Sequence, residues 1–189
     1  MEANPFIRMN RYIMFVVYFM FVLWSEPNYM KNSIKKLEWQ TAYQLSELLS
    51  EDSALLQLAG KSLEQAYAPY SKFKVGAAVL LSDGQMLGGS NQENAAYPLC
   101  LCAERVALSA AASLAPKELI KSMAITVKAH KQTVSQPAMP CGSCRQSLCE
   151  IEFKQQQPIR LIIRGEEGPI YIFQSALDIL PFSFNASFL

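Results

Sequence analysis

Five cysteines constrain this chain more than any other feature, because all of them lie within 50 residues of a 189-residue sequence. They are Cys100, Cys102, Cys141, Cys144 and Cys149. An odd number of cysteines confined to one region does not resemble a disulfide framework. We therefore expect reduced thiols, some of which bind a metal ion or carry redox chemistry.

The pair Cys141-Gly-Ser-Cys144 at a predicted helix start is, taken alone, ambiguous between a redox motif and half of a metal site. Cys102 adds a third thiol at the start of another predicted helix. Three thiolates suit zinc and leave a fourth position open, as in catalytic zinc sites. Helix N-termini also stabilise thiolates. We interpret Cys149 as a packing thiol and Cys100 as a buried small thiol, with competition between Cys100 and Cys102 for the metal as the alternative.

Two charged residues follow Cys102 directly in Cys102-Ala-Glu104-Arg105. Beside a zinc site, Glu104 can accept a proton from water and deliver it elsewhere. Its alternative role is an acidic residue favoured by the helix dipole. Arg105 can offset the thiolate charge by hydrogen-bonding to a ligand sulfur, or it can form an ordinary surface ion pair.

Hydrophobic periodicity and turn residues predict an alternating order of helices and strands. Helices are expected over 37–49, 53–67 (capped by Ser53), 102–115, 140–153 and 175–180. Strands are expected over 75–81, 85–89, 123–127, 159–163 and 170–173. This order predicts an α/β fold, a three-layer α-β-α sandwich around a mixed sheet of about five strands.

The net charge of +1, from 17 basic and 16 acidic residues, excludes a strongly basic nucleic-acid binder and an acidic tail protein. The length allows one domain with an appendage. We expect residues 30–189 to form that domain, and residues 1–29 to be an apolar extension outside the fold.

The extension contains an unbroken apolar run of 13 residues from Tyr12 to Trp24, preceded by Arg8 and Arg11. A membrane-spanning helix needs about 20 such residues. The segment also lacks the cleavage site that a signal peptide needs. The alternatives left open are an upstream extension ahead of a true start at Met30, a membrane-targeting segment, and a partner-binding arm.

Three segments together resemble the zinc-dependent cytidine deaminases that act on free nucleosides, over roughly residues 53–184. The zinc signature is a ligand, one residue and Glu, followed by Pro-Cys-x-x-Cys. The segments that carry the resemblance are 67–78, 89–105 and 140–146. The chain is similar to the compact subclass with cysteine ligands only, which forms homotetramers.

The resemblance implies a role for each matching residue. Cys102, Cys141 and Cys144 would bind one zinc ion per chain, and Glu104 would be the catalytic proton shuttle. Asn91 and Glu93 would hydrogen-bond the ribose, Phe73 would stack on the pyrimidine, and the backbone of Ala103 would read the base edge. Tyr97 would reach a neighbouring subunit's site, and Phe184 would close that site's apolar wall.

The implied activity is hydrolytic deamination of cytidine and deoxycytidine, in pyrimidine salvage, by a cytoplasmic homotetramer with shared active sites. No nucleic-acid or membrane partner is expected. The alternatives are a nucleic-acid-editing deaminase, a deaminase of a nucleoside-like antibiotic and a noncatalytic zinc module. Near-neutral charge and the Asn91/Glu93 pair argue against the first, and Glu104 argues against the last. His130, the only histidine, is expected to be a loop residue.

Overall fold

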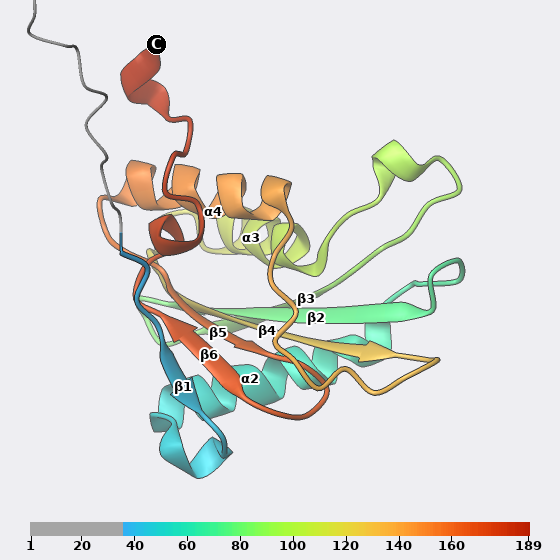
Figure 1. Cartoon of the computed structure of the whole chain (residues 1–189). Helices are drawn as coiled ribbons and strands as arrows, with labels where there is room; N and C mark the ends of the chain where they lie inside the picture. Colours follow the sequence, from blue (N-terminus) through green and yellow to red (C-terminus); the bar gives the residue numbers. More distant parts are fainter. Residues whose placement is uncertain (1–35) are drawn as a thin grey trace, which may run out of the picture. The chain divides into compact units, whose positions relative to one another are not determined.

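The centre of the fold is a pair of long apolar strands, as the computed structural model of the chain shows (Figure 1). The structure describes residues 36–189. β2 (Phe73–Leu81) and β4 (Ile120–Ala129) pair antiparallel along nearly their whole length. Val79 and Met123 lie opposite each other and are fully buried. Strands that are apolar on both faces require a covering layer on each side of the sheet.

Four further strands extend this pair into one sheet of order β1-β6-β5-β4-β2-β3. They are β1 (Gln40–Ala42), β3 (Met86–Ser90), β5 (Arg160–Arg164) and β6 (Ile170–Phe173). β4 and β5 run parallel, and every other neighbouring pair is antiparallel. The sheet is therefore mixed, as predicted.

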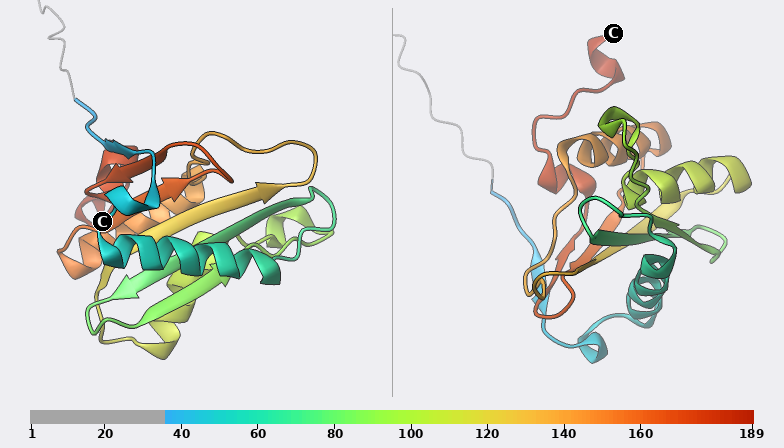
Figure 2. Two further views of the ribbon diagram at one scale, coloured as in Figure 1. Left: turned by 90° about the horizontal axis from the view of Figure 1, so that it is seen from below. Right: turned by 90° about the vertical axis from the view of Figure 1, so that its right-hand side faces the viewer.

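Helices cover both faces, which confirms the three-layer arrangement (Figures 1 and 2). α2 (Ser50–Ser62) packs on one face, where Leu55 and Ala59 are fully buried. α3 (Ala103–Leu114) and α4 (Gly142–Gln155) cover the other. Side chains alternate along a strand, so β2, β4, β5 and β6 each contribute residues to both cores.

The predicted helix over 37–49 is wrong. This segment instead contains β1 and a short 3-10 turn, Leu45–Glu47. The Trp39 ring packs against Tyr171 and Phe173, with ring centroids 6.0 Å and 6.5 Å away. Next to it, β1 pairs antiparallel with β6. A partner about 130 residues away decides this local conformation, and it gives the sheet six strands instead of about five.

The predicted helix over 53–67 begins earlier, at Ser50, and Ser53 is not its cap. Glu51 and Asp52 occupy the first turn, where acidic side chains favour the helix dipole. The buried Asp52 also accepts a hydrogen bond from Arg160 Nε at 3.0 Å, which ties α2 to β5. The helix start is thus fixed by a tertiary contact.

The remaining elements are short. The helix predicted over 175–180 is a 3-10 helix, Ala176–Ile179, with Ser175 and Asp178 forming a capping box. The other 3-10 turns are Leu63–Gln65, Tyr97–Leu99 and Ala186–Phe188. Within the described range, no helix has the length and apolar character needed to cross a membrane. The predictions for residues 1–29 lie outside that range.

Candidate metal centre and substrate site

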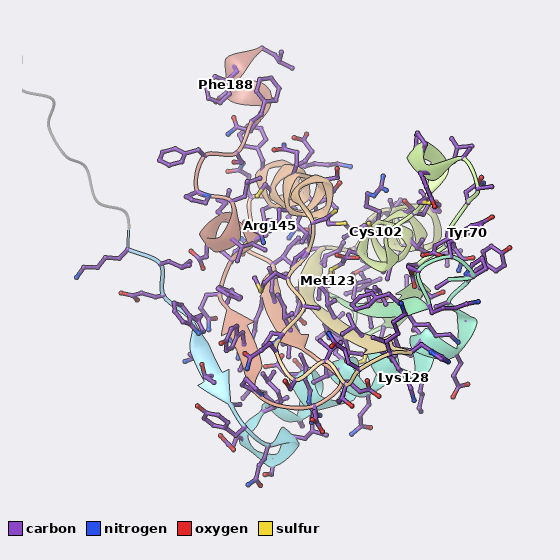
Figure 3. All side chains as sticks on the ribbon, turned by 45° about the vertical axis from the view of Figure 1, so that its right-hand side comes forward. Tyr70, Cys102, Met123, Lys128, Arg145 and Phe188 are labelled. Carbon is purple, nitrogen blue, oxygen red and sulfur yellow. The ribbon has the colours of Figure 1, made fainter. Side chains whose placement is uncertain are left out.

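The starts of α3 and α4 bring three cysteines together. Cys102 directly precedes α3, Cys141 directly precedes α4, and Cys144 lies in the first turn of α4. The Sγ atoms of Cys102 and Cys141 are 3.8 Å apart, and those of Cys141 and Cys144 are 3.5 Å apart. All three sulfur atoms lie within 4.8 Å of one another. Figure 3 shows Cys102 at the start of α3, on the side of the sheet that α3 and α4 cover.

This triangle of sulfurs fits a zinc ion. Zinc binds thiolates at about 2.3 Å in tetrahedral geometry, which places neighbouring sulfurs about 3.8 Å apart. The two short distances match that value without rearrangement of either helix. Three protein ligands leave one position of the tetrahedron open, as catalytic zinc requires. In the described part of the chain, the only group of three or more His, Cys, Asp or Glu residues that could hold a metal ion is this one.

The thiols of Cys102 and Cys144 are electrostatically coupled, and their pKa values are shifted in opposite directions. Interaction with Cys144 contributes most to lowering the pKa of Cys102 to about 5, and Cys141 and Arg105 act in the same direction. The pKa of Cys144 is raised, first by its interaction with Cys102 and then by burial. A cation among the three sulfurs would displace the protons that they share.

Glu104 lies in the first turn of α3, two residues from Cys102. Its side chain is buried, with the residue only 4% exposed. Burial raises the pKa of the Glu104 carboxyl, and the charge of Cys102 acts in the same direction. A carboxyl group whose pKa is raised in this way holds a proton more readily than a free glutamate does, which suits a proton shuttle.

Close packing of α3 on β3 fixes the position of this helix start. A Cβ atom at Gly89 would lie 2.5 Å from the Ala107 nitrogen and 2.6 Å from the Ala103 carbonyl oxygen. Only glycine allows that approach. Ala103 is fully buried as the first residue of α3. The base-reading role expected for its backbone remains a prediction.

Asn91 and Glu93 both bind the segment that leads into β2. The Asn91 side-chain oxygen accepts from the Val75 amide at 2.8 Å, and its nitrogen donates to the Phe73 carbonyl at 3.0 Å. Glu93 Oε2 accepts from the Tyr70 and Ser71 amides at 2.9 Å and 3.3 Å.

The Ser71 hydroxyl, followed by these two amides, lowers the pKa of Glu93, so its carboxylate is ionised. Each Asn91 atom retains one hydrogen-bonding position, and Glu93 retains its other oxygen for a ligand.

Phe73 begins β2 and is half-buried. It shares a face with Val75, which packs against the core beneath α3 and α4, so Phe73 is on the side of the cysteine cluster. Tyr97 and Phe184 are 71% and 58% exposed. Their rings contact Tyr70 and Phe188 respectively.

Comparison with known proteins agrees with this geometry. Residues 49–157 match the family model described as the cytidine and deoxycytidylate deaminase zinc-binding region. The chain belongs to this family.

Among curated relatives, the cytidine deaminase of Halalkalibacterium halodurans is 44% identical over 97 residues, which are 51% of this chain and 69% of that protein. The cytidine deaminase of Sporosarcina psychrophila is 43% identical over 51% of this chain and 66% of its own length. The chain thus aligns with about two thirds of these relatives.

Solved structures extend the likeness over more of the chain. The cytidine deaminase of Burkholderia pseudomallei is 39% identical, with a TM-score of 0.59, and the match covers 69% of this chain and 97% of that one. The cytidine deaminase of Mycobacterium tuberculosis is 31% identical, with a TM-score of 0.53, and the match covers 69% and 94%. The fold of the deaminase is therefore that of its relatives.

Arg105 of this deaminase lies where its charge acts on the cluster. Its Nη2 donates to the Cys100 carbonyl at 3.0 Å, and its buried Nε has no hydrogen-bond partner in the part of the chain that the structure describes. Burial, the largest single influence, lowers the pKa of Arg105, but the combined interactions with Cys102, Cys144 and Cys141 outweigh burial, so the pKa is raised. The electrostatic coupling favours the predicted charge compensation over a surface ion pair, since no carboxylate pairs with Arg105 among the described residues.

Arg145 is a positioning residue that sequence reasoning missed. Its Nε donates to the Pro140 carbonyl at 2.8 Å, and its Nη1 donates to the Ile179 carbonyl at 3.0 Å. These bonds hold the chain that leads into Cys141. Arg145 directly follows Cys144 in the sequence, and this adjacency was the only available signal.

The other cysteines and the histidine are outside the cluster. The Cys100 thiol accepts from the Asn94 amide at 3.2 Å and closes the loop that carries Tyr97. Cys149 is buried and donates to the Ala176 carbonyl at 3.7 Å. His130 is exposed directly after β4. Neither cysteine belongs to the metal group. The burial of Cys149 agrees with its interpretation as a packing thiol, whereas Cys100 is only half-buried and not buried as expected.

Proposed function

We propose that this deaminase converts cytidine and deoxycytidine, with water, to uridine and deoxyuridine and ammonia, as a step of pyrimidine salvage. The single observation that carries the proposal is the buried Glu104 carboxyl beside the triangle formed by Cys102, Cys141 and Cys144. The names of its relatives support the substrate class.

The cysteine triangle would hold one zinc ion, which supplies a Lewis acid that lowers the pKa of water toward neutrality and so provides a nucleophile. Glu104 accepts the proton that the water loses and delivers it to the ring nitrogen next to the amine-bearing carbon, while the hydroxide oxygen forms a bond to that carbon. Glu104 then takes the remaining proton from the added hydroxyl and passes it to the amine, so that the C–N bond breaks, a carbonyl forms and ammonia leaves. The raised pKa of Glu104 suits a group that must both accept and donate in one cycle.

Substrate orientation falls to residues around the start of β2. Phe73 offers an aromatic face for the pyrimidine, and Asn91 and Glu93 offer an amide and an ionised carboxylate for the ribose hydroxyls. Because both side chains also hold the backbone from Tyr70 to Val75, they position Phe73 as well. Ribose binding and the positioning of Phe73 therefore depend on the same few hydrogen bonds of Asn91 and Glu93.

The active unit in this proposal is a homotetramer in the cytoplasm, formed by the domain of residues 30–189. Tyr97 and Phe184 are exposed aromatic residues that a neighbouring subunit would cover. The segment that follows Pro181 rises beyond α4, where it can reach another copy (Figures 1 and 2). The cytosol supplies the reduced thiols that zinc binding needs.

Ammonia release from cytidine by the zinc-loaded protein is the direct test. Parallel assays with deoxycytidine, single-stranded DNA and single-stranded RNA separate a nucleoside deaminase from a nucleic-acid-editing enzyme. We expect turnover of both nucleosides and none of the polynucleotides. Zinc-loaded protein that releases no ammonia from either nucleoside would contradict the proposal.

A further inference from the structure

Lysine residues lie close together at one end of the sheet, on the face opposite the cysteine cluster. Lys74 and Lys128 are directly opposite each other in the β2–β4 register. They share a face with Ala78 and Ala124, which pack under α2. Figure 3 shows Lys128 toward that side of the sheet, away from Cys102. Like charges at directly opposed positions destabilise a strand pair, so this arrangement calls for a compensating anion.

A cavity of about 340 Å³ opens at this pair. Lys72, Lys74 and Lys128 line it together with Glu64, and Leu63 and Ala68 form an apolar wall. Three lysines therefore line this cavity against a single carboxylate, so the lining has an excess of positive charge.

A second cavity, of about 310 Å³, adjoins the first and shares Leu63 and Lys128 with it. It is lined by Glu166 and by Arg164, whose buried Nε has no hydrogen-bond partner within residues 36–189. Glu166 lies 4.0 Å from the Lys128 ammonium, at the outer limit of an ion pair. A buried guanidinium donor without a partner is costly unless a ligand accepts from it.

We propose that the joined cavities bind a multiply charged phosphate anion, either inorganic polyphosphate or the phosphate chain of a nucleotide. Lysine and arginine are the side chains that bind phosphate oxygens, and Arg164 adds a directed donor to three point charges. This anion site is separate from the deaminase centre, because the sheet lies between them.

The anion site is connected to the substrate side through one short segment. Phe73 stands between Lys72 and Lys74 in the chain, and Asn91 holds the backbone of Phe73 and Val75. An anion that neutralises Lys74 and Lys128 strengthens the pairing of Phe73 with Ala129 at the same strand ends. Occupancy therefore stiffens the start of β2 and lowers KM for cytidine.

Calorimetric titration of the zinc-loaded protein with inorganic triphosphate at constant ionic strength tests the site without turnover. The double variant Lys74→Gln/Lys128→Gln should bind at least about tenfold more weakly than wild type. The control Lys117→Gln/Lys121→Gln removes the same charge from exposed positions outside both cavities and should bind as wild type does. Withdrawal of zinc by triphosphate would affect both variants equally.

The anion site would be overturned if wild type bound no triphosphate, or if both double variants bound it equally weakly. It would also be overturned if Lys74→Gln/Lys128→Gln changed the oligomeric state of the protein in the absence of triphosphate. Titration with a nucleoside triphosphate distinguishes the sources, since tighter binding than inorganic triphosphate indicates a nucleotide.

The link to the substrate rests on the proposed function and has its own assay. Saturating triphosphate should lower KM for cytidine by about fivefold, the low end of typical coupling between sites. An unchanged KM would overturn the link alone, and absent turnover would contradict the proposed function without touching the binding result.

Discussion

The metal centre and the substrate rim, by which we mean Tyr97 and Phe184, differ in how much of each a single chain supplies. Cys102, Glu104, Cys141 and Cys144 come from two helix starts that pack on one sheet, and their sulfurs already stand at zinc-binding distances. Tyr97 and Phe184 lie on exposed segments instead. A single subunit thus supplies all three cysteines of the metal centre, whereas we propose that enclosure of the substrate depends on assembly.

Loss of a ligand should have the largest effect, because it removes the metal. We expect Cys102→Ala to hold almost no zinc and to show no measurable turnover, since two thiolates and water bind zinc far more weakly than three thiolates. Elemental analysis of the purified protein measures the metal. Cys100→Ala is the matched control and should retain one zinc per chain. If Cys100→Ala lost zinc and Cys102→Ala kept it, the ligand assignment would be wrong.

Glu104→Gln should come next. Glutamine keeps the size of the side chain and Glu104 is not a ligand, so zinc and fold should remain. Turnover should fall at least ~100-fold, the low end for the loss of a general acid–base group. Steady-state assays and zinc content measured on the same sample separate the two effects. Near-normal turnover would rule out the proton-shuttle role.

A smaller effect is expected at the rim. Phe184→Ala should raise KM for cytidine about tenfold, because it removes an apolar wall of a neighbour's site while leaving the metal centre intact. Phe182→Ala is the matched control, since Phe182 is 91% exposed and only two residues away. Sedimentation of the wild type should show a tetramer.

Mixed tetramers test directly whether Phe184 completes the site of a neighbouring subunit. Chains carrying Glu104→Gln and chains carrying Phe184→Ala should regain activity when refolded together, because some sites then combine an intact Glu104 with a neighbour's intact Phe184. Tetramers of either single variant would lack such sites. No recovery, or full activity in a monomer, would place Phe184 outside the shared site.

The sequence could predict the metal centre because its signals are local. Cys102, Glu104 and the Pro-Cys-x-x-Cys segment each lie at a helix start that the residue pattern marks, and both helices form within one or two residues of the predicted positions. The neighbouring strands expected over 75–81 and 85–89 likewise pair as the hairpin of β2 and β3. Cys102 and Cys141 are 39 residues apart, so their meeting at one metal site was predicted from the zinc signature and not from the local pattern alone.

Non-local contacts explain what was missed. β1 exists because it pairs with β6, and α2 begins at Ser50 with Asp52 bonded to Arg160, more than 100 residues away. The bonds from Asn91 and Glu93 to the start of β2, and from Arg145 to Pro140 and Ile179, depend on the assembled fold. Periodicity within a segment carries no information about such partners.

Removal of residues 1–29 should have the smallest effect. A chain that begins at Met30 should match the full-length protein in turnover, zinc content and tetramer formation, because β1 and every site residue remain. It should also be more soluble, since it lacks the apolar run from Tyr12 to Trp24. Loss of activity in this chain would show that residues 1–29 belong to the fold.

A chain that begins at Leu49, where the family match starts, provides the contrast. It loses β1 and the Trp39 contacts with Tyr171 and Phe173, which are worth ~0.5–1.5 kcal/mol each beyond their buried area. Its melting temperature should therefore fall. The kcat of the molecules that remain folded should stay within about twofold of the full-length value, because β1 lies at the far edge of the sheet from β2 and β3. Thermal unfolding and single-temperature kinetics on both chains separate these effects. An equal melting temperature would mean that β1 adds nothing to the stability of the domain, and a large fall in kcat would mean that the metal centre depends on this edge.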